Sequence, residues 1–244
     1  MRWSELCAEV VQANRRLEEA GLVVLSFGNA SAVDRTAGVF AIKPSGVPYA
    51  QLTPEDIVVV AIEDGRVVQG TLRPSSDTPT HRVLYQRYPA LGGMVHTHSP
   101  FATAWAQARR EIPCFGTTHA DSFHGPVPVT RPLSAAEIEG EYEHNTGLVI
   151  VERLEAEALD PLHVPGVLVA SHGPFTWGQT GADAVTTAIA LEAIAAMALR
   201  TLAIAPGTPS VEEALRERHF TRKHGPRAYY GQPAAAEHAA AADR

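Results

Sequence analysis

The sequence contains few of the residues that build disulfide frameworks or cysteine metal sites. Among its 244 residues only Cys7 and Cys114 are cysteines, which gives neither a framework of paired thiols nor a Cys-x-x-Cys motif. This composition fits a reducing cytoplasm, and we expect a cytoplasmic protein. The segment that opens the chain turns acidic at Glu5 without a preceding apolar stretch, so we expect no secretory signal there.

Clustered positive charge and long apolar runs free of charge are also scarce. The formal net charge is -7, and Lys and Arg gather only between residues 216 and 223, so we expect no nucleic-acid partner. The most apolar segment, residues 182–205, is interrupted by Asp183, Glu192 and Arg200. Those charges predict a buried core helix, and therefore no membrane partner. An anionic small molecule remains compatible with this composition.

The remaining composition is that of a globular protein, with 45% hydrophobic residues and 19% charged residues. A chain of this length buries one sizeable core, and no internal linker or repeat divides it. We therefore predict a single α/β domain over residues 1–232. The Ala-rich segment 233–244 is expected to be a disordered tail.

Two histidines one residue apart end a short apolar run, Gly92 to His98. Side chains alternate along a strand, so His96 and His98 leave it on the same face, close enough to share one cation. Alternation alone also allows a solvated polar face. A second apolar run, 166–170, leads to His172 and then to turn-forming residues. Three histidines with one open position are typical of a catalytic zinc site.

Three loops supply donors that a phosphate group requires. They contain Gly28-Asn29, Lys43 with Ser45-Gly46, and Ser75-Ser76. The first is predicted to follow a strand over residues 23–27. The serines precede a predicted helix, where free backbone N–H groups and a positive dipole end favour an anion. Each loop alone is equally explained as a turn or a cap.

Other polar residues allow two interpretations each. Asp77 is either a helix N-cap or a carboxylate of the site. Asp121 closes a segment, 117–121, that we predict to be a polar loop, and loops carry function disproportionately. The pair Tyr229-Tyr230 either anchors the C-terminus or serves the chemistry. The residues themselves do not separate these alternatives.

These segments together resemble the class II aldolase/epimerase family, and within it the L-ribulose-5-phosphate 4-epimerases. The resemblance runs from about Leu6 to Gln232 and is carried by seven motifs, at residues 28–35, 43–47, 74–81, 96–99, 116–121, 172–178 and 222–232. It implies a central, mainly antiparallel sheet flanked by helices in a three-layer sandwich. It also implies a homotetramer with its active sites at subunit interfaces and with one zinc ion per subunit.

The resemblance also implies the roles of individual residues. The residues that match the metal and substrate binders are His96, His98 and His172 for zinc, Asp77 as a carboxylate at the metal, and Asn29, Lys43, Ser45, Gly46, Ser75 and Ser76 for the substrate and its phosphate. Asp121 matches one catalytic acid/base, and Tyr230 of a neighbouring subunit matches the other. Thr117 and Arg222 match residues that reach the substrate from the neighbour.

The implied activity is zinc-dependent epimerisation of L-ribulose 5-phosphate to D-xylulose 5-phosphate at carbon 4. The hydrogen on that carbon is not acidic, because the carbon is β to the carbonyl, so the route would break and remake the bond between carbons 3 and 4. A sugar-phosphate aldolase of the L-fuculose-phosphate type is one alternative. A zinc hydrolase and a non-catalytic module like the adducin head domain are others.

Overall fold

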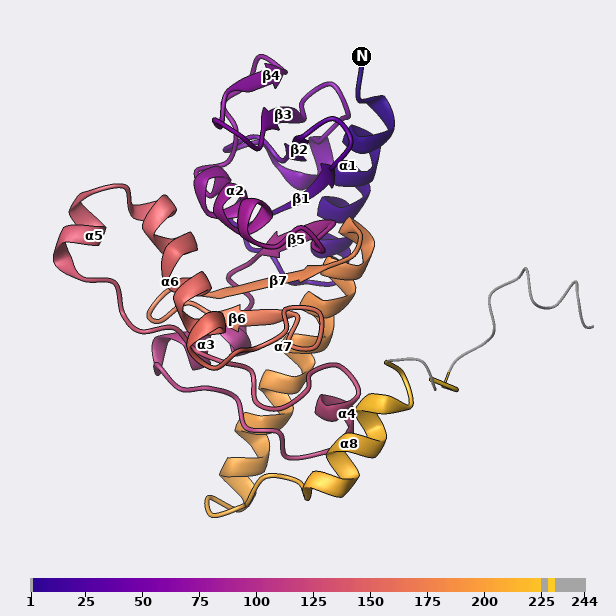
Figure 1. Ribbon diagram of the computed structural model, residues 1–244, viewed down its shortest axis with the longest axis vertical. Helices are drawn as coiled ribbons and strands as arrows, with labels where there is room; N and C mark the ends of the chain where they lie inside the picture. Colours follow the sequence, from indigo (N-terminus) through magenta and orange to yellow (C-terminus); the bar gives the residue numbers. More distant parts are fainter. Residues whose placement is uncertain (1, 225–227, 231–244) are drawn as a thin grey trace, which may run out of the picture.

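The computed structural model describes residues 2–224 and 228–230, and within them one sheet organises the chain (Figure 1). Its strands follow the order β4-β3-β2-β1-β5-β7-β6, and every neighbouring pair is antiparallel. The strands are β1 (Asn29–Asp34), β2 (Val39–Ile42), β3 (Val58–Ala61), β4 (Val67–Gln69), β5 (Gly93–His96), β6 (Gly166–Leu168) and β7 (Pro174–Gly178). The predicted mainly antiparallel sheet is confirmed. The predicted tail, 233–244, lies outside the described residues.

Helices cover both faces of the sheet, as Figure 1 shows. They are α1 (Ser4–Glu19), α2 (Thr78–Arg87), α3 (Pro100–Gln107), α4 (Thr117–Ala120), α5 (Ala135–Glu139), α6 (Tyr142–Ala156), α7 (Gly181–Ile204) and α8 (Glu213–Thr221), with a short 3-10 helix, η1 (Tyr49–Gln51). Helices α1 and α7 lie on one face, whereas α2 and α6 lie on the other. The chain thus forms the predicted three layers.

Alternation along the strands decides which layer each side chain enters. In β5, Met94 packs with residues of α2 and α6, whereas Val95 packs with α1 and α7. His96 therefore leaves the sheet on the same face as Met94. In β1, Ala30 packs with α1 and α7, so its neighbour Asn29 leaves on the face that carries His96. The sheet brings these two polar side chains to one side before any loop contributes.

The long apolar helix α7 has the length and composition of a membrane span. In the structure, Ala184 and Val185 pack under β1 and β5, and Leu191 packs against α3. Glu192 accepts hydrogen bonds from the backbone N–H groups of Phe101 and Ala102, at 2.8 and 2.9 Å, and so caps the start of α3. The prediction of a core helix is confirmed, and its charges have structural partners.

Two local predictions are wrong. Residues 23–27 are not a strand, because the chain enters the sheet only at Asn29, after Gly28 has turned it with a φ of 83°. Residues 117–121 are not an irregular loop, because Thr117–Ala120 forms one helical turn. The N–H of Asp121 donates to the carbonyl of Thr117 at 2.9 Å and closes that turn. Short apolar or polar runs do not reveal such differences, since tertiary contacts decide them.

Candidate functional site

The end of β5 delivers the first two histidines. Antiparallel pairing places His96 opposite Asn29 of β1 on one side and opposite Phe175 of β7 on the other. The imidazole of His96 stacks on the Phe175 ring, with centroids 4.2 Å apart, and its Nδ1 lies 3.0 Å from the carbonyl oxygen of Pro174. Its Nε2 is therefore left to face Nε2 of His98, 3.1 Å away.

The connection between β6 and β7 delivers the third histidine. Here the backbone approaches so closely that a Cβ on Gly173 would lie 2.8 Å from the carbonyl oxygen of Thr97. This close passage brings the His172 ring within 4.7 Å of the His96 ring and 5.1 Å of the His98 ring, centroid to centroid. One nitrogen from each of the three lies within 4.8 Å of the others.

This donor set fits a divalent metal ion. Bonds of about 2.0–2.1 Å from zinc to imidazole, at tetrahedral angles, separate two ligand nitrogens by about 3.3 Å, close to the spacing seen between His96 and His98. Burial lowers the pKa of His96 to about 3, with a further contribution from His98. Burial also lowers the pKa values of His98 and His172. All three rings are therefore neutral near pH 7, which is the form that binds metals.

A cavity of about 360 Å³ opens beside the three histidines, and we call it the metal cavity. Its lining includes all the residues predicted to bind metal, phosphate or substrate from this side of the chain, namely Asn29, Lys43, Ser45, Gly46, Ser75, Ser76, Asp77, His96, His98 and His172. Sequence positions from five separate segments thus meet in one place. The structure brings together the three histidines and the donors predicted to bind a phosphate.

Lys43 supplies the positive charge of the metal cavity. Its side chain is buried, its Nζ lies 4.7 Å from the centroid of the Tyr49 ring, and it donates to the carbonyl of Pro44 at 3.3 Å. No ion pair with a carboxylate is recorded for it in the part of the chain that the structure describes. Burial lowers the pKa of the Lys43 ammonium group. A buried cation without a counter-ion is a site for an anion.

The loop that contains Ser75 and Ser76, which we call the serine loop, is held beside Lys43 by a backbone hydrogen bond. The N–H of Ser75 donates to the carbonyl of Lys43 at 3.1 Å. The hydroxyl oxygen of Ser75 accepts from Asn29 Nδ2 at 3.0 Å, so its own proton is directed elsewhere. Asn29 Nδ2 also donates to Asp77 Oδ2 at 2.7 Å. Asp77 occupies the N-cap position of α2 without a side-chain cap, which favours its interpretation as a carboxylate of the site.

Three of the remaining predicted residues, Asp121, Arg222 and Tyr230, form a separate group in which residues of the C-terminal segment contact Asp121. Asp121 Oδ1 accepts from Nε of Arg222 at 3.0 Å and lies 3.0 Å from Nδ1 of His219, and Asp121 Oδ2 accepts from Nη2 of Arg222 at 2.6 Å. The guanidinium carbon of Arg222 lies 4.5 Å from the centroid of the Tyr230 ring. Lys223 approaches both Asp121 and Tyr230. We call these five residues the C-terminal cluster.

Charge in the C-terminal cluster favours an ionised aspartate. Partial burial alone would raise the pKa of Asp121, but hydrogen bonds from Arg222 and His219 and the nearby Lys223 outweigh it and hold that pKa below its usual value. Asp121 is therefore a carboxylate near neutral pH and a proton acceptor. Tyr230 is exposed, and its N–H donates to the carbonyl of Arg222 at 3.0 Å.

None of the C-terminal cluster lines the metal cavity. Asp121 and Lys223 line a different cavity beside Trp177, and Thr117 lines a third against α7. Within the single chain, Arg222 contacts both Asp121 and Tyr230. The expectation that these two residues reach one active site from different subunits stays a prediction.

Tyr142 and Glu143, at the start of α6, also line the metal cavity and were not predicted to do so. Thr80 of α2 donates its hydroxyl to the carbonyl of Glu143 and so fixes the start of α6 beside the start of α2. No local motif marks these positions. Only the packing of α6 on α2 brings these two residues to the cavity, and a sequence pattern does not reveal that packing.

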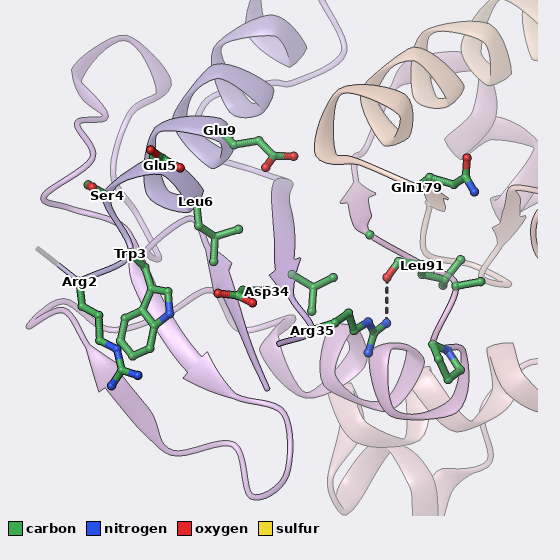
Figure 2. Close-up of a pocket in the computed structure, with 14 residues that line it drawn as sticks. Arg2, Trp3, Ser4, Glu5, Leu6, Glu9, Asp34, Arg35, Leu91 and Gln179 are labelled. Carbon is green, nitrogen blue, oxygen red and sulfur yellow. Dashed lines mark hydrogen bonds between the residues drawn. The ribbon is translucent and has the colours of Figure 1, made fainter. Parts of the chain in front are cut away.

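A larger open cavity, of about 710 Å³, lies away from the histidines beside the start of α1 (Figure 2). Its lining carries both signs of charge, including Glu5, Glu9 and Arg35. The Arg35 guanidinium donates to the backbone carbonyls of Tyr85 and Leu91, at 2.7 and 2.8 Å, and so caps the end of α2. Its charge already serves the fold, so we do not assign chemistry to this cavity.

Comparison with known proteins agrees with this fold and this site. The family model described as the class II aldolase and adducin N-terminal domain matches residues 8–199, and the chain belongs to that family. It is 54% identical over 228 residues to L-ribulose-5-phosphate 4-epimerase UlaF from Salmonella paratyphi A and from Salmonella typhi, covering 93% of this chain and 99% of each relative. The solved structure of an L-fuculose 1-phosphate aldolase has the same fold. Its TM-score is 0.75 at 23% identity, covering 89% of this chain and 95% of that one.

Proposed function

We propose that this protein is a metal-dependent L-ribulose-5-phosphate 4-epimerase, which converts its substrate to D-xylulose 5-phosphate. The observation that carries the proposal is the metal cavity, where three neutral histidines and a buried, uncompensated Lys43 open into one space. A sugar phosphate needs both parts, one for its carbonyl end and one for its phosphate. The 54% identity to proteins named for this activity supports the choice of substrate.

The phosphate would bind Lys43 and the donors of the serine and glycine loops. The hydroxyl of Ser75, oriented by Asn29, and the exposed Ser76 present directional donors, and Lys43 adds a point charge. Because backbone hydrogen bonds pair the loop of Lys43 with the loop of Ser75, these groups would hold the phosphate end while the bond between carbons 3 and 4 is broken. The aldehyde fragment is thereby retained, can turn over, and can be attacked on its opposite face.

We propose zinc as the metal held by His96, His98 and His172, with Asp77 close to it. When bound, zinc supplies a Lewis acid that stabilises negative charge developing on the carbonyl half of the substrate. The histidines of the metal cavity would position the ion and exclude water, because His96 is buried and packs against Phe175.

The proton transfers fall to the C-terminal cluster in this proposal. The carbon-4 hydroxyl must lose a proton on one face and regain one on the other, which requires two acid/base groups. The carboxylate of Asp121 would accept a proton, and the hydroxyl of Tyr230 would donate one. Arg222 contacts both and keeps Asp121 ionised. Thr117, at the start of the same short helix as Asp121, would face the substrate beside them.

A second copy of the chain must complete the site, because the C-terminal cluster does not line its own metal cavity. We therefore propose a homotetramer, acting in the cytoplasm, in which each metal cavity receives the C-terminal cluster of a neighbour. Both Asp121 and Tyr230 then come from that neighbour. The alternative expected from sequence, with Tyr230 alone given by the neighbour, is separated from this proposal by mixing inactive subunits.

Product analysis tests the proposal directly. Purified protein is assayed for metal content and incubated with L-ribulose 5-phosphate, before and after treatment with a chelator. We expect D-xylulose 5-phosphate, loss of activity on metal removal, and recovery on adding zinc. Net release of dihydroxyacetone and glycolaldehyde phosphate would indicate the aldolase alternative. A metal-loaded protein with no turnover would instead indicate a non-catalytic module.

A further inference from the structure

The three histidines of the metal cavity differ in how their second ring nitrogen is held. A histidine that binds metal through one nitrogen normally donates a hydrogen bond from the other, which fixes both its tautomer and its orientation. For His96, the backbone provides this acceptor, since Nδ1 lies 3.0 Å from the carbonyl oxygen of Pro174. This contact is buried between two strands and cannot rotate away.

Within residues 2–224 and 228–230, no backbone carbonyl accepts a hydrogen bond from the His172 ring. His172 follows Ser171, whose φ of 65° marks a sharp turn, and it lies on a connection rather than on a strand. In the described part of the chain, the hydrogen bond recorded for its ring joins Nδ1 to the hydroxyl oxygen of Tyr142, at 3.3 Å. The two rings lie 6.2 Å apart, centroid to centroid, with their planes inclined by only 30°.

The fold holds Tyr142 firmly at this distance. It is the first residue of α6, and Thr146 donates its hydroxyl to the Tyr142 carbonyl at 2.9 Å. Helix α6 packs so tightly on α2 that a Cβ on Gly147 would lie 2.7 Å from Cβ of Val83. Because α2 itself begins at the metal cavity, the position of Tyr142 is coupled to the site through helix packing.

We propose that Tyr142 is a positioning residue for the metal, whose hydroxyl accepts the Nδ1 proton of His172 and leaves Nε2 turned toward His96 and His98. The inference rests on the proposed metal-dependent function and adds to it a residue from outside the three histidine segments. Without the hydroxyl, the His172 ring is free to rotate and to change tautomer. A ligand that must be ordered on binding holds the metal less tightly.

The test compares Tyr142→Phe with Tyr88→Phe. Each change removes one hydroxyl group, and the Tyr88 hydroxyl is buried without a recorded partner near the end of α2. Zinc affinity is measured by competition with a chelator, and the absorption spectrum of cobalt-substituted protein reports ligand geometry. We expect Tyr142→Phe to bind zinc about tenfold more weakly, with an altered cobalt spectrum. Tyr88→Phe should match wild type in both.

Other measurements separate positioning from a structural role and from failure of the proposed function. The unfolding midpoint of metal-free Tyr142→Phe should equal that of wild type, and excess zinc should restore most of its turnover. If wild type binds zinc and Tyr142→Phe binds it equally well with the same cobalt spectrum, the positioning role is wrong while the metal site stands. If wild type binds no zinc, the proposed function and this inference are both overturned.

Discussion

The metal cavity and the C-terminal cluster are built in different ways. In the metal cavity, strand pairing and close backbone approach place the functional groups, and His96 and Lys43 are almost wholly buried. In the C-terminal cluster, Arg222 and Lys223 form ion pairs with Asp121, and Tyr230 is 58% exposed. The first half is preformed by the core. The C-terminal cluster lies at the surface, where it could contact another molecule.

This difference matches the two tasks of the proposed reaction, which are binding of the substrate and transfer of protons. Binding of a metal and a dianion demands preorganised, desolvated groups, which a core provides. In the proposed reaction, proton transfer falls to groups that a neighbouring subunit would present, which an exposed segment provides. The metal cavity supplies the binding groups and the C-terminal cluster supplies the acid/base groups. A substitution in either should therefore abolish the same activity for a different reason.

The largest effect is expected from His98→Ala, which breaks the metal cavity. The variant should lose bound zinc and at least about 10³-fold in turnover, because the Lewis acid contributes several kcal/mol to the barrier. The fold should survive, since the core does not depend on the metal. Metal analysis and product assay check this, with exposed His163→Ala as the matched control. Full zinc occupancy with full activity in His98→Ala would show that the assignment is wrong.

Asp121→Asn breaks the C-terminal cluster and should lower turnover by about 10²–10⁴-fold, the usual contribution of a general acid or base. Zinc content should stay unchanged. Mixing the two inactive variants tests whether the metal cavity and the C-terminal cluster of one active site come from different subunits. His98→Ala and Asp121→Asn subunits should restore each other, because an intact metal cavity then meets an intact cluster.

If Asp121 and Tyr230 come from the same neighbour, as proposed from their shared contact with Arg222, mixing Asp121→Asn with Tyr230→Phe should restore nothing. Subunit exchange is verified by mass spectrometry of tagged chains. Recovery of activity in this second mixture would contradict the arrangement and return Asp121 to the subunit that holds the metal.

A smaller effect is expected from Ser76→Asp at the phosphate end of the metal cavity. A carboxylate there replaces a donor with a like charge and should weaken substrate binding by about 2 kcal/mol, or roughly 30-fold in KM. Zinc content should not change. The exposed Ser210→Asp serves as control for the added charge. Kinetics of Ser76→Asp identical to wild type would remove the serine loop from the phosphate site.

The smallest effect concerns stability at the C-terminal cluster. The pKa of Asp121 is lower in the folded protein than in the unfolded chain, so its contacts stabilise the protein above the unfolded pKa of about 3.9 and are lost as the pH falls through the folded value. Asp121→Asn should therefore destabilise metal-free protein by about 1–2 kcal/mol at neutral pH. Urea unfolding should show this difference constant down to about pH 5 and shrinking below about pH 4. A difference that grows on acidification would contradict it.

Much of the metal cavity could be predicted from sequence because local rules govern it. Alternation along a strand predicted that His96 and His98 lie together, and although β5 ends at His96 their Nε2 atoms are 3.1 Å apart. Donor-rich loops at element ends point to an anion. The strand predicted at 23–27 failed because an apolar run does not show where pairing begins. That point is set by Gly28, where a Cβ would lie 2.6 Å from the carbonyl oxygen of His96.

What could not be predicted depends on contacts distant in sequence. Tyr142 enters the metal cavity only because α6 packs on α2. The grouping of Asp121 with Tyr230 depends on Arg222, which lies about a hundred residues after Asp121 and reaches back to it. Family resemblance supplied Asp121, Arg222 and Tyr230 as candidate residues, but it did not show that they contact one another within one chain.

The buried ammonium of Lys43 has a consequence for the thermodynamics of the whole protein. Holding a desolvated cation without a counter-ion costs folding free energy throughout the neutral pH range, and an anion that binds beside it offsets that cost. Ligand linkage converts this into heat stability, worth about 2.7 kcal/mol when the anion is present at a hundred times its Kd. If the substrate phosphate binds beside Lys43 as proposed, the melting temperature of the protein becomes a gauge of phosphate occupancy, readable before any turnover has begun.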